Sequence, residues 1–399
     1  MVRLAAFWVV FFAALFAAVA LAVGLGGGEE PADDPWAAVP PAPSHLDHGP
    51  FFEEPFADGP AVTRACLECH PDAAREVMAT SHWTWASDEI PLPGRDETGR
   101  VGKRNLINNF CISIAGNEPR CTSCHAGYGW EDDGFDFGDE TRVDCLVCHD
   151  TTGTYFKDPA GAGRPAPGVD LLAVARGVGA PSRSNCGACH FAGGGGDAVK
   201  HGDMDASMNH PSPRVDVHMG EHGFVCQDCH RTEAHRIPGC AMSVCLEKTR
   251  RVACTDCHAR EPHGDERLDG HTAAVACEAC HIPQMAVDAA TKVAWNWSDA
   301  GKTIAQLAAD RPELLERALA KWDPSPAQRA ARDFEARKLE RFAAYLERHR
   351  LFDPNKGTFE LAERVVPEYY WYNGRSYRYL TGDPIDPDGP TAIARPLGD

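Results

Sequence analysis

Cysteine and histidine recur along this chain in one fixed spacing, Cys-x-x-Cys-His. Its seven copies are Cys66-Cys69-His70, Cys121-Cys124-His125, Cys145-Cys148-His149, Cys186-Cys189-His190, Cys226-Cys229-His230, Cys254-Cys257-His258 and Cys277-Cys280-His281. Two thiols at this spacing can add across the vinyl groups of one haem, and the adjacent imidazole can then ligate its iron. The spacing therefore predicts seven covalently attached c-type haems, which we number as motifs 1 to 7 in chain order.

Zinc knuckles are the alternative interpretation of these cysteines, because Cys-x-x-Cys is also half of a tetrahedral zinc site. A histidine follows the second cysteine directly in all seven copies, however, and the chain starts with an export-like segment. An invariably adjacent histidine is typical of haem attachment. We therefore expect haem c as the cofactor.

The N-terminal residues 1–28 combine a basic start at Arg3 with an unbroken apolar run from Leu4 to about Gly28. This pattern is typical of a secretory signal peptide. The run is also longer than 18 residues, so it equally suits a transmembrane anchor. Both alternatives place the haem motifs outside the cytoplasm, and we expect a periplasmic protein.

Composition bounds the kind of partner. The formal net charge is -19, and the carboxylates of bound haems would make it more negative. This charge argues against nucleic acid and against an anionic membrane surface as partners, but it says nothing about a substrate.

Each predicted iron needs a second, distal axial ligand. Of the eleven histidines outside the motifs, six lie near a motif and beside glycine, proline or aromatic residues. These expected distal ligands are His82, His201, His218, His235, His263 and His271. His48 stays open as an alternative. Six histidines for seven irons leave one iron for a different ligand or an open position.

Three further features stand apart from the motifs. Lys200 and His201 follow a run of four glycines, and adjacent side chains point in different directions, so two neighbouring irons could each take one. Cys111 is an unpaired thiol ten residues before motif 2. Cys240 and Cys245 lack a following histidine, and in an oxidising compartment we expect them to form a disulfide.

The organisation that follows is mainly α-helical with extensive coil, arranged around the covalent haems. Residues 29–60 are rich in Pro, Asp and Glu and are expected to form a linker. Residues 61–298 contain the multihaem c domain. Residues 299–399 are expected to form a helical C-terminal region packed on it, because apolar residues recur at helical spacing between 304 and 346. The aromatic cluster at 369–372 is expected to pack in a core.

Four segments carry a resemblance to a known family. Phe110-Cys111 to Trp130, Lys200-His201-Gly202-Asp203, Asp216-Val217-His218-Met219 and Cys280-His281-Ile282-Pro283 resemble the octahaem tetrathionate reductase family. The likeness runs from about residue 50 to residue 395. It implies a catalytic haem on Cys121 and Cys124 with Lys200 as its unusual iron ligand, and it places Cys111 in the same pocket.

The same resemblance implies a function, and the chain departs from the family at two points. It implies a reductase of small sulfur or nitrogen compounds such as tetrathionate, nitrite or hydroxylamine, fed by a quinol-linked or soluble periplasmic cytochrome donor. The family carries an eighth Cys-x-x-Cys-His motif near the C-terminus, which these 399 residues do not contain, and Cys240 and Cys245 are unlike it. A non-catalytic electron-transfer cytochrome is the alternative function, and it would need strong distal ligands on every iron.

Overall fold

The computed structural model describes residues 34–41, 44–106, 114–192, 196–197, 202–239, 251–320, 326, 336–369, 371, 373, 375–385, 387–388 and 394–398. The chain divides into two compact units. One contains residues 253–277 together with the N-terminal segment, and the other contains Pro43–Val252 and Glu278–Asp399. No helix within the described ranges is long and apolar enough to cross a membrane, and residues 1–33 lie outside those ranges.

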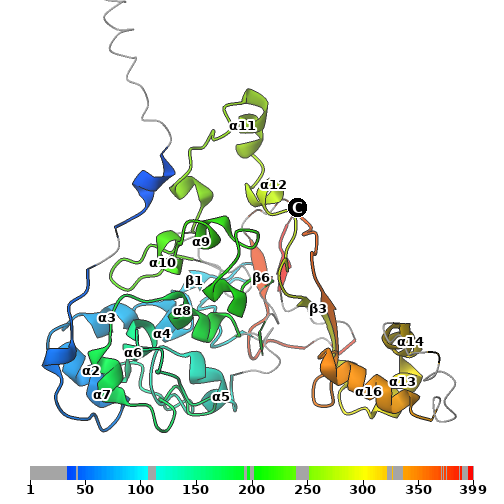
Figure 1. The fold of residues 1–399 in the computed structure, drawn as a ribbon, viewed down its shortest axis with the longest axis horizontal. Helices are drawn as coiled ribbons and strands as arrows, with labels where there is room; N and C mark the ends of the chain where they lie inside the picture. Colours follow the sequence, from blue (N-terminus) through cyan, green and yellow to red (C-terminus); the bar gives the residue numbers. More distant parts are fainter. Residues whose placement is uncertain are drawn as a thin grey trace, which may run out of the picture. The chain divides into compact units, whose positions relative to one another are not determined.

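The larger unit begins with short helices joined by loops (Figure 1). They are α2 (Gly59–Leu67), α3 (Ala73–Met78), α4 (Ser81–Thr84), α5 (Glu118–Cys121), α6 (Leu146–His149), α7 (Leu171–Arg176), α8 (Arg183–His190), α9 (Val217–Gly220) and α10 (Cys226–Cys229). Two short strands, β1 (Ile90–Pro91) and β2 (Thr98–Gly99), pair antiparallel between α4 and α5. This mainly helical, coil-rich architecture confirms the predicted fold class.

Polar caps define where several of these helices begin. The Asp58 carboxylate accepts a hydrogen bond from the Ala61 N–H at the start of α2, and Asp170 and Asp216 cap α7 and α9 in the same way. Ser182 and Asn185 form a capping box at the start of α8. Helices this short are marginal on their own. Tertiary packing must therefore hold them.

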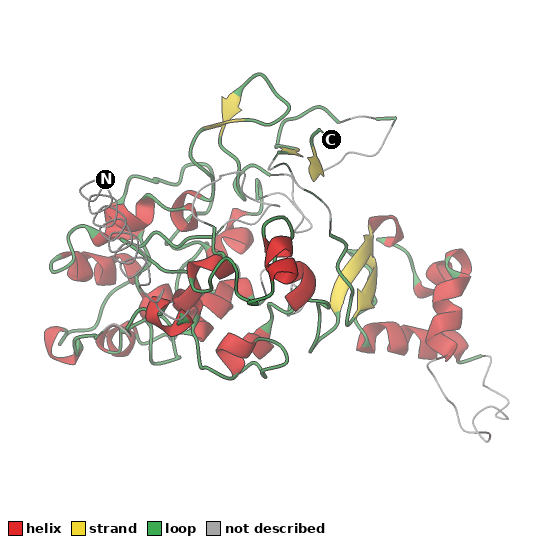
Figure 2. Ribbon diagram, turned by 90° about the horizontal axis from the view of Figure 1, so that it is seen from above, coloured by secondary structure: helices red, strands yellow, loops and turns green. Residues whose placement is uncertain are grey.

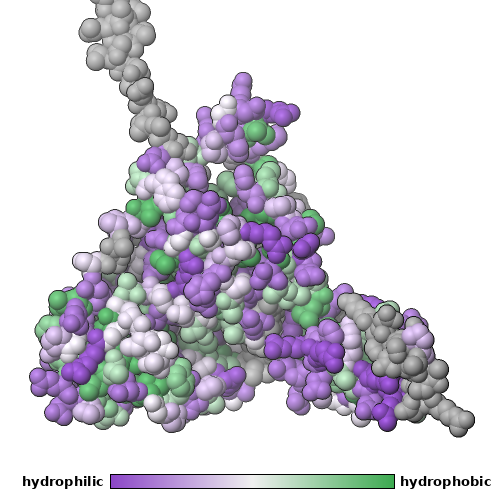
Figure 3. Space-filling model, in the orientation of Figure 1, coloured by the Kyte–Doolittle hydropathy of each residue, from purple (hydrophilic) through white to green (hydrophobic). Residues whose placement is uncertain are grey.

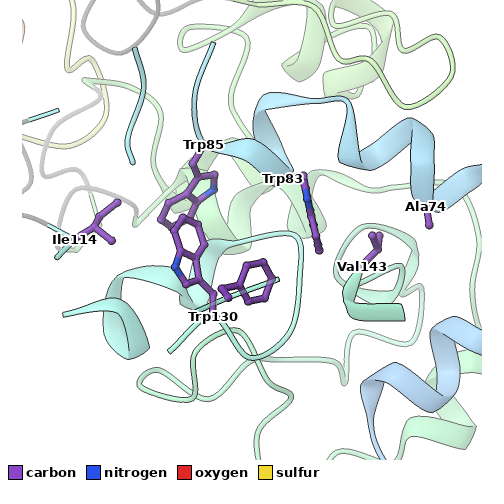
Figure 4. Close-up of a cluster of buried hydrophobic side chains, with 7 residues drawn as sticks. Ala74, Trp83, Trp85, Ile114, Trp130 and Val143 are labelled. Carbon is purple, nitrogen blue, oxygen red and sulfur yellow. The ribbon is translucent and has the colours of Figure 1, made fainter. Parts of the chain in front are cut away.

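Two apolar clusters provide that packing. Val62 of α2, Leu146 of α6, and Val174 and Ala175 of α7 form one of them. The other is mainly aromatic and contains Ala74, Trp83, Trp85, Ile114, Trp130, Phe135 and Val143 (Figure 4). The second cluster surrounds motif 2, so the best-packed part of the unit is built around a predicted haem site.

The C-terminal part of this unit contains a sheet and three helices. Strand β5 (Gly357–Ala362) lies between β3 (Thr291–Asn296) and β4 (Phe352–Asp353), and both pairings are antiparallel. Helices α13 (Ile304–Asp310), α14 (Pro312–Ala320) and α16 (Lys338–Arg348) pack through an apolar cluster that includes Leu307, Leu314, Phe342 and Leu346 (Figures 1 and 2). Helices were expected here, whereas the strands were not.

A second hairpin joins the end of the chain to the loop after β1. Strand β6 (Ser376–Arg378) pairs with β7 (Ala394–Pro396). Arg95 forms a two-pronged ion pair with Asp383, and its Nη2 also donates to the Arg378 carbonyl at 2.7 Å. The expectation that the aromatic cluster at 369–372 is core was wrong for its two described members, since Tyr369 and Trp371 are 51% and 79% exposed.

Among its described residues, the smaller unit contains two turns of 3-10 helix, Pro35–Ala38 and Cys254–Asp256, and helix α11 (Glu266–Thr272). Asp265 caps α11 by accepting hydrogen bonds from the Arg267 and Leu268 N–H groups. Thr272 Oγ1 donates to the Arg260 carbonyl at 2.8 Å, and this hydrogen bond connects the end of α11 to the loop after motif 6.

A buried carboxylate, Asp299, connects the sheet to α13 and α14. Its side chain is 1% exposed and pairs with Lys302 Nζ at 2.8 Å, and Thr358 Oγ1 of β5 donates to it at 2.6 Å. Burial alone would raise the pKa of Asp299, but the hydrogen bonds and the positive charges of Lys302 and Arg311 outweigh it and hold the pKa below the ordinary value.

We expect Asp299→Asn to lower the local stability of the sheet by roughly 2–3 kcal/mol at neutral pH, because a charged, hydrogen-bonded acceptor is lost among cations. A carboxylate with a lowered folded-state pKa stabilises above the ordinary pKa of 3.8 and loses this effect as pH falls through the folded-state value. The difference from wild type should therefore shrink below pH 4. Hydrogen exchange of peptides from β3 and β5 measures it.

The matched control is Asp310→Asn, which removes a carboxylate that also pairs with Lys302, at 2.9 Å, but is 52% exposed. Exposed ion pairs contribute little, so this variant should exchange like wild type. Equal protection in both variants would contradict the role of Asp299.

Candidate haem sites

Four of the cysteine motifs share one local geometry, whereas in motif 2 the His125 N–H donates to the Thr122 carbonyl instead. In motifs 1, 3, 5 and 6 the histidine N–H donates to the carbonyl of the first cysteine, at 2.8–3.1 Å, which closes a single helical turn. Residues three and four positions apart lie on the same face of such a turn. Both thiols and the imidazole of one motif therefore face the same side, as attachment to a single haem requires.

Thiols of different motifs also meet. The side chains of Cys66 and Cys145, of Cys124 and Cys189, and of Cys186 and Cys226 lie close enough to shift one another's pKa. Cys148 is close enough to raise the pKa of both Cys186 and Cys189. Motif 4 therefore neighbours motifs 2, 3 and 5, and motif 3 neighbours motif 1.

Three motif histidines face a second histidine at nearly the same separation. The ring centres are 6.3 Å apart for His48 and His70, 6.2 Å for His82 and His190, and 6.3 Å for His149 and His235. A metal bound by two imidazoles at the usual bond length of about 2.0–2.1 Å would separate the ring centres by roughly 6.3 Å. The spacing therefore fits one iron between the members of each pair.

The hydrogen bonds of these imidazoles leave a nitrogen for that iron. His149 Nδ1 bonds the Gly179 carbonyl at 2.9 Å, and His48 Nδ1 bonds the Leu46 carbonyl at 2.8 Å. His235 Nδ1 bonds the Glu76 carboxylate at 2.8 Å. Metal-ligating histidines usually hold a carbonyl or carboxylate with the nitrogen opposite the metal, and this partner orients the ring.

The lowered pKa values of two of these histidines also favour iron binding. Burial lowers the pKa of His82, and it also lowers the pKa of His149 despite a hydrogen bond to the Gly179 carbonyl. A histidine ligates a metal only as the neutral imidazole. Burial thus keeps both rings in the form that an iron needs.

Exposed apolar side chains near these histidines are also consistent with a haem. Four exposed apolar residues lie within three positions of a motif or candidate ligand histidine: Phe51 near His48, Val217 near His218, Ile237 near His235 and Ile282 near His281. In the face shown in Figure 3, apolar residues are interspersed among hydrophilic ones. A bound macrocycle would cover such side chains, which suits the fit of haem at these sites.

Motif 2 differs from the others. His125 is fully buried in a cage of Trp83, Trp85, Trp130, Phe135 and Phe137, with ring centres 5.0–6.3 Å away. Its Nε2 bonds the Trp83 carbonyl at 2.7 Å, and its Nδ1 has no hydrogen-bond partner. Burial lowers the pKa of His125 to about 3. An iron would have to replace the Trp83 carbonyl or use the orphaned Nδ1, so the fit is incomplete here.

A buried polar network links motif 2 to motif 3. The Asp144 carboxylate accepts from the hydroxyls of Tyr128 at 2.8 Å and Tyr155 at 2.7 Å, and it pairs with Lys157 Nζ at 3.0 Å. Lys157 Nζ also donates to the His125 carbonyl. Asp144 directly precedes Cys145, so this network fixes the backbone of both motifs relative to one another.

The other predicted ligands divide into two groups. His218 is on α9, while His263 and His271 belong to the smaller unit with motif 6, where His263 Nδ1 bonds Asp269 at 3.0 Å. Cys111, Lys200, His201, Cys240 and Cys245 lie outside the described residues. His48 was left as an alternative in the predicted set, and only its position opposite His70 singles it out.

Known proteins are similar to this chain over most of its length. Residues 292–399 match the family model described as bacterial cytochrome c. An uncharacterized protein of Archaeoglobus fulgidus is 24% identical over 260 residues, covering 53% of this chain and 84% of that protein. The crystal structure of octaheme cytochrome c from Shewanella oneidensis is 43% identical with a TM-score of 0.70, covering 89% of this chain and 72% of that one.

These likenesses agree with the motif geometry. The likeness to the solved structure covers 89% of this chain. Haem c is thereby supported as the cofactor of this chain. The chain belongs to the family of multihaem c-type cytochromes represented by the octaheme cytochrome c of Shewanella oneidensis.

Proposed function

We propose that this protein is a periplasmic multihaem reductase that passes electrons along seven haems to a catalytic haem at motif 2. The observation that carries the electron-transfer part is the set of three histidine pairs at 6.2–6.3 Å. Bound haems would supply the redox chemistry, while the protein supplies their ligands, spacing and electrostatics. The apolar run at residues 4–28 supports export of the chain.

His70, His190 and His149 would hold their irons together with His48, His82 and His235. His201, His218, His263 and His271 remain our candidates for the other motifs. With His48 added, seven distal histidines and Lys200 are available for seven irons, so one histidine of this set would have another role. The Glu76 carboxylate on His235 would strengthen that imidazole as a donor.

The thiol contacts support an order for the relay. Motif 1 neighbours motif 3, motif 3 neighbours motif 4, and motif 4 neighbours both motif 2 and motif 5. Motif 4 is therefore a branch point with motif 2 on one arm. Electrons from a quinol-linked or soluble cytochrome donor would reach motif 2 through it.

Motif 2 is our proposed catalytic site because its environment is unlike that of the paired motifs. No second histidine ring faces His125 among the described residues. We propose Lys200 as the second ligand of this iron. A lysine amine binds iron only when deprotonated, so a substrate would displace it more readily than an imidazole. Tetrathionate, nitrite and hydroxylamine are the proposed substrates. A relay without catalysis would instead require a strong ligand pair here too.

Cys111 would act on tetrathionate through its thiolate. The thiolate attacks the central sulfur–sulfur bond, which releases one thiosulfate and leaves a thiosulfonate on Cys111. Two electrons from the donor then break the new sulfur–sulfur bond, release the second thiosulfate and restore the thiolate. Nitrite and hydroxylamine offer no such bond, so Cys111 would be only a pocket residue for them.

His48→Ala should convert one haem from six-coordinate to five-coordinate, because the iron at His70 would lose its second imidazole. The expected result is one high-spin ferric signal in the electron paramagnetic resonance spectrum, with seven haems retained by intact mass. The control is His45→Ala, which removes a ring 5.0 Å from His48 that makes no ring contact with a motif histidine among the described residues. An unchanged spectrum in His48→Ala would exclude it as a ligand.

Lys200→His should abolish reduction of tetrathionate, nitrite and hydroxylamine while the haem count stays the same. An imidazole would make motif 2 an inert six-coordinate centre. Turnover is measured as reoxidation of the reduced holoprotein by each substrate. Wild-type rates would show that the catalytic haem lies elsewhere.

Cys111→Ser should lower the rate with tetrathionate by at least about a hundredfold and leave nitrite reduction within a few-fold, since loss of a covalent nucleophile typically costs several kcal/mol. The ratio of the two rates is the decisive quantity. Equal losses on both substrates would remove the thiol from the mechanism without affecting the choice of motif 2.

A further inference from the structure

A small cavity of about 240 Å³ lies beside the aromatic cage of His125. Met78, Trp83 and Phe137 form its apolar walls, and Arg100 and Arg104 bring two positive charges to it. Trp83 and Phe137 belong to both the cavity and the cage. The cavity is thus separated from His125 by a single layer of aromatic side chains.

Both arginines are exposed to solvent, and each makes a side-chain contact that leaves most of its donors unused. The Arg104 guanidinium lies 4.4 Å from the centre of the Phe137 ring, and its backbone N–H donates to the Trp85 carbonyl at 3.0 Å. Arg100 Nη1 donates to the Ser87 carbonyl at 3.0 Å. Each guanidinium carries five N–H donors, so most of them remain available for a ligand.

The cavity is lined by positive charge, whereas the chain as a whole is negatively charged. The formal net charge is -19, yet neither Arg100 nor Arg104 forms an ion pair with any described carboxylate. Lys103 adds a third cation, with Nζ 4.3 Å from the centre of the Trp85 ring. Cations gathered in this way in an acidic protein create a local field that attracts anions.

From this arrangement we propose that Arg100 and Arg104 bind an inorganic oxyanion beside motif 2 and favour dianions over monoanions. This inference rests on the proposed reductase function and specifies its substrate class. Each of the two guanidinium groups can make charge-assisted hydrogen bonds to the oxygens of a sulfonate group. A dianion such as tetrathionate gains most from them, nitrite gains less, and hydroxylamine, which is uncharged at neutral pH, gains nothing.

Calorimetric titration of oxidised holoprotein with sodium tetrathionate and with sodium sulfate tests the binding directly. Arg104→Ala should weaken both dianions about tenfold, the effect of losing one charge-assisted hydrogen bond, and Arg100→Ala should do the same. Arg104→Lys should lose less, because it keeps the charge. Added salt should weaken binding to wild type more than to the variants.

Arg348→Ala is the matched control, since it removes an exposed arginine from α16, whose apolar face packs in a different cluster. It should bind both dianions like wild type. In steady-state assays, Arg104→Ala should raise KM for tetrathionate about tenfold, raise it less for nitrite and leave it unchanged for hydroxylamine. Haem retention by intact mass confirms that the variants remain folded.

Two results would overturn the proposal. One is unchanged dianion affinity in both alanine variants. The other is an equal loss of affinity in Arg348→Ala, which would mean that the effect comes from the overall charge and not from the cavity. The titration needs no turnover, so a protein that binds dianions through these arginines but reduces none of the substrates would refute the reductase function alone.

Discussion

In motifs 1, 3, 5 and 6, the hydrogen bond from the histidine N–H to the first cysteine carbonyl organises the chain locally. It closes one helical turn and puts two sulfurs and one imidazole on the same face. A single helical turn of five residues is not stable by itself in water, because the entropy lost on forming it exceeds the free energy of its one hydrogen bond. Each motif therefore depends on what its three side chains bind and on the neighbours packed behind it.

That dependence explains the loop-rich fold. Most helices of the larger unit are four to nine residues long, and their apolar clusters are small apart from the aromatic group around motif 2. Seven macrocycles would add the apolar core that the polypeptide lacks. Cysteines of neighbouring motifs lie close together, so haems attached to them would also be neighbours. The same contacts that complete the core would thus provide the path for electrons.

The sequence was sufficient for features encoded within a few residues and insufficient for features that depend on tertiary structure. The motifs, the mainly helical class and the helices at 304–348 followed from spacing alone. The position of His48 opposite His70 did not, because residues 29–60 show no periodicity and a histidine there looks solvated. Strand β3, Thr291–Asn296, was missed because its partner β5 lies about sixty residues later, beyond three helices. The exposed Trp371 was misjudged because aromatic clusters usually pack inside.

A reductase of oxyanions built on an acidic chain faces an electrostatic conflict, since its overall field repels its own substrate. Local reversal of that field resolves the conflict only if it lies near the reactive site. In the segment 95–104, Arg95 is neutralised by Asp383, whereas Arg100 and Arg104 face the cavity beside His125. His125 is the caged motif histidine, and no histidine ring faces it in the described part of the chain, so the two arginines lie beside the motif that differs most from the paired ones. We therefore place the proposed chemistry on an anion at motif 2, because a relay haem needs neither the positive charge nor the aromatic cage.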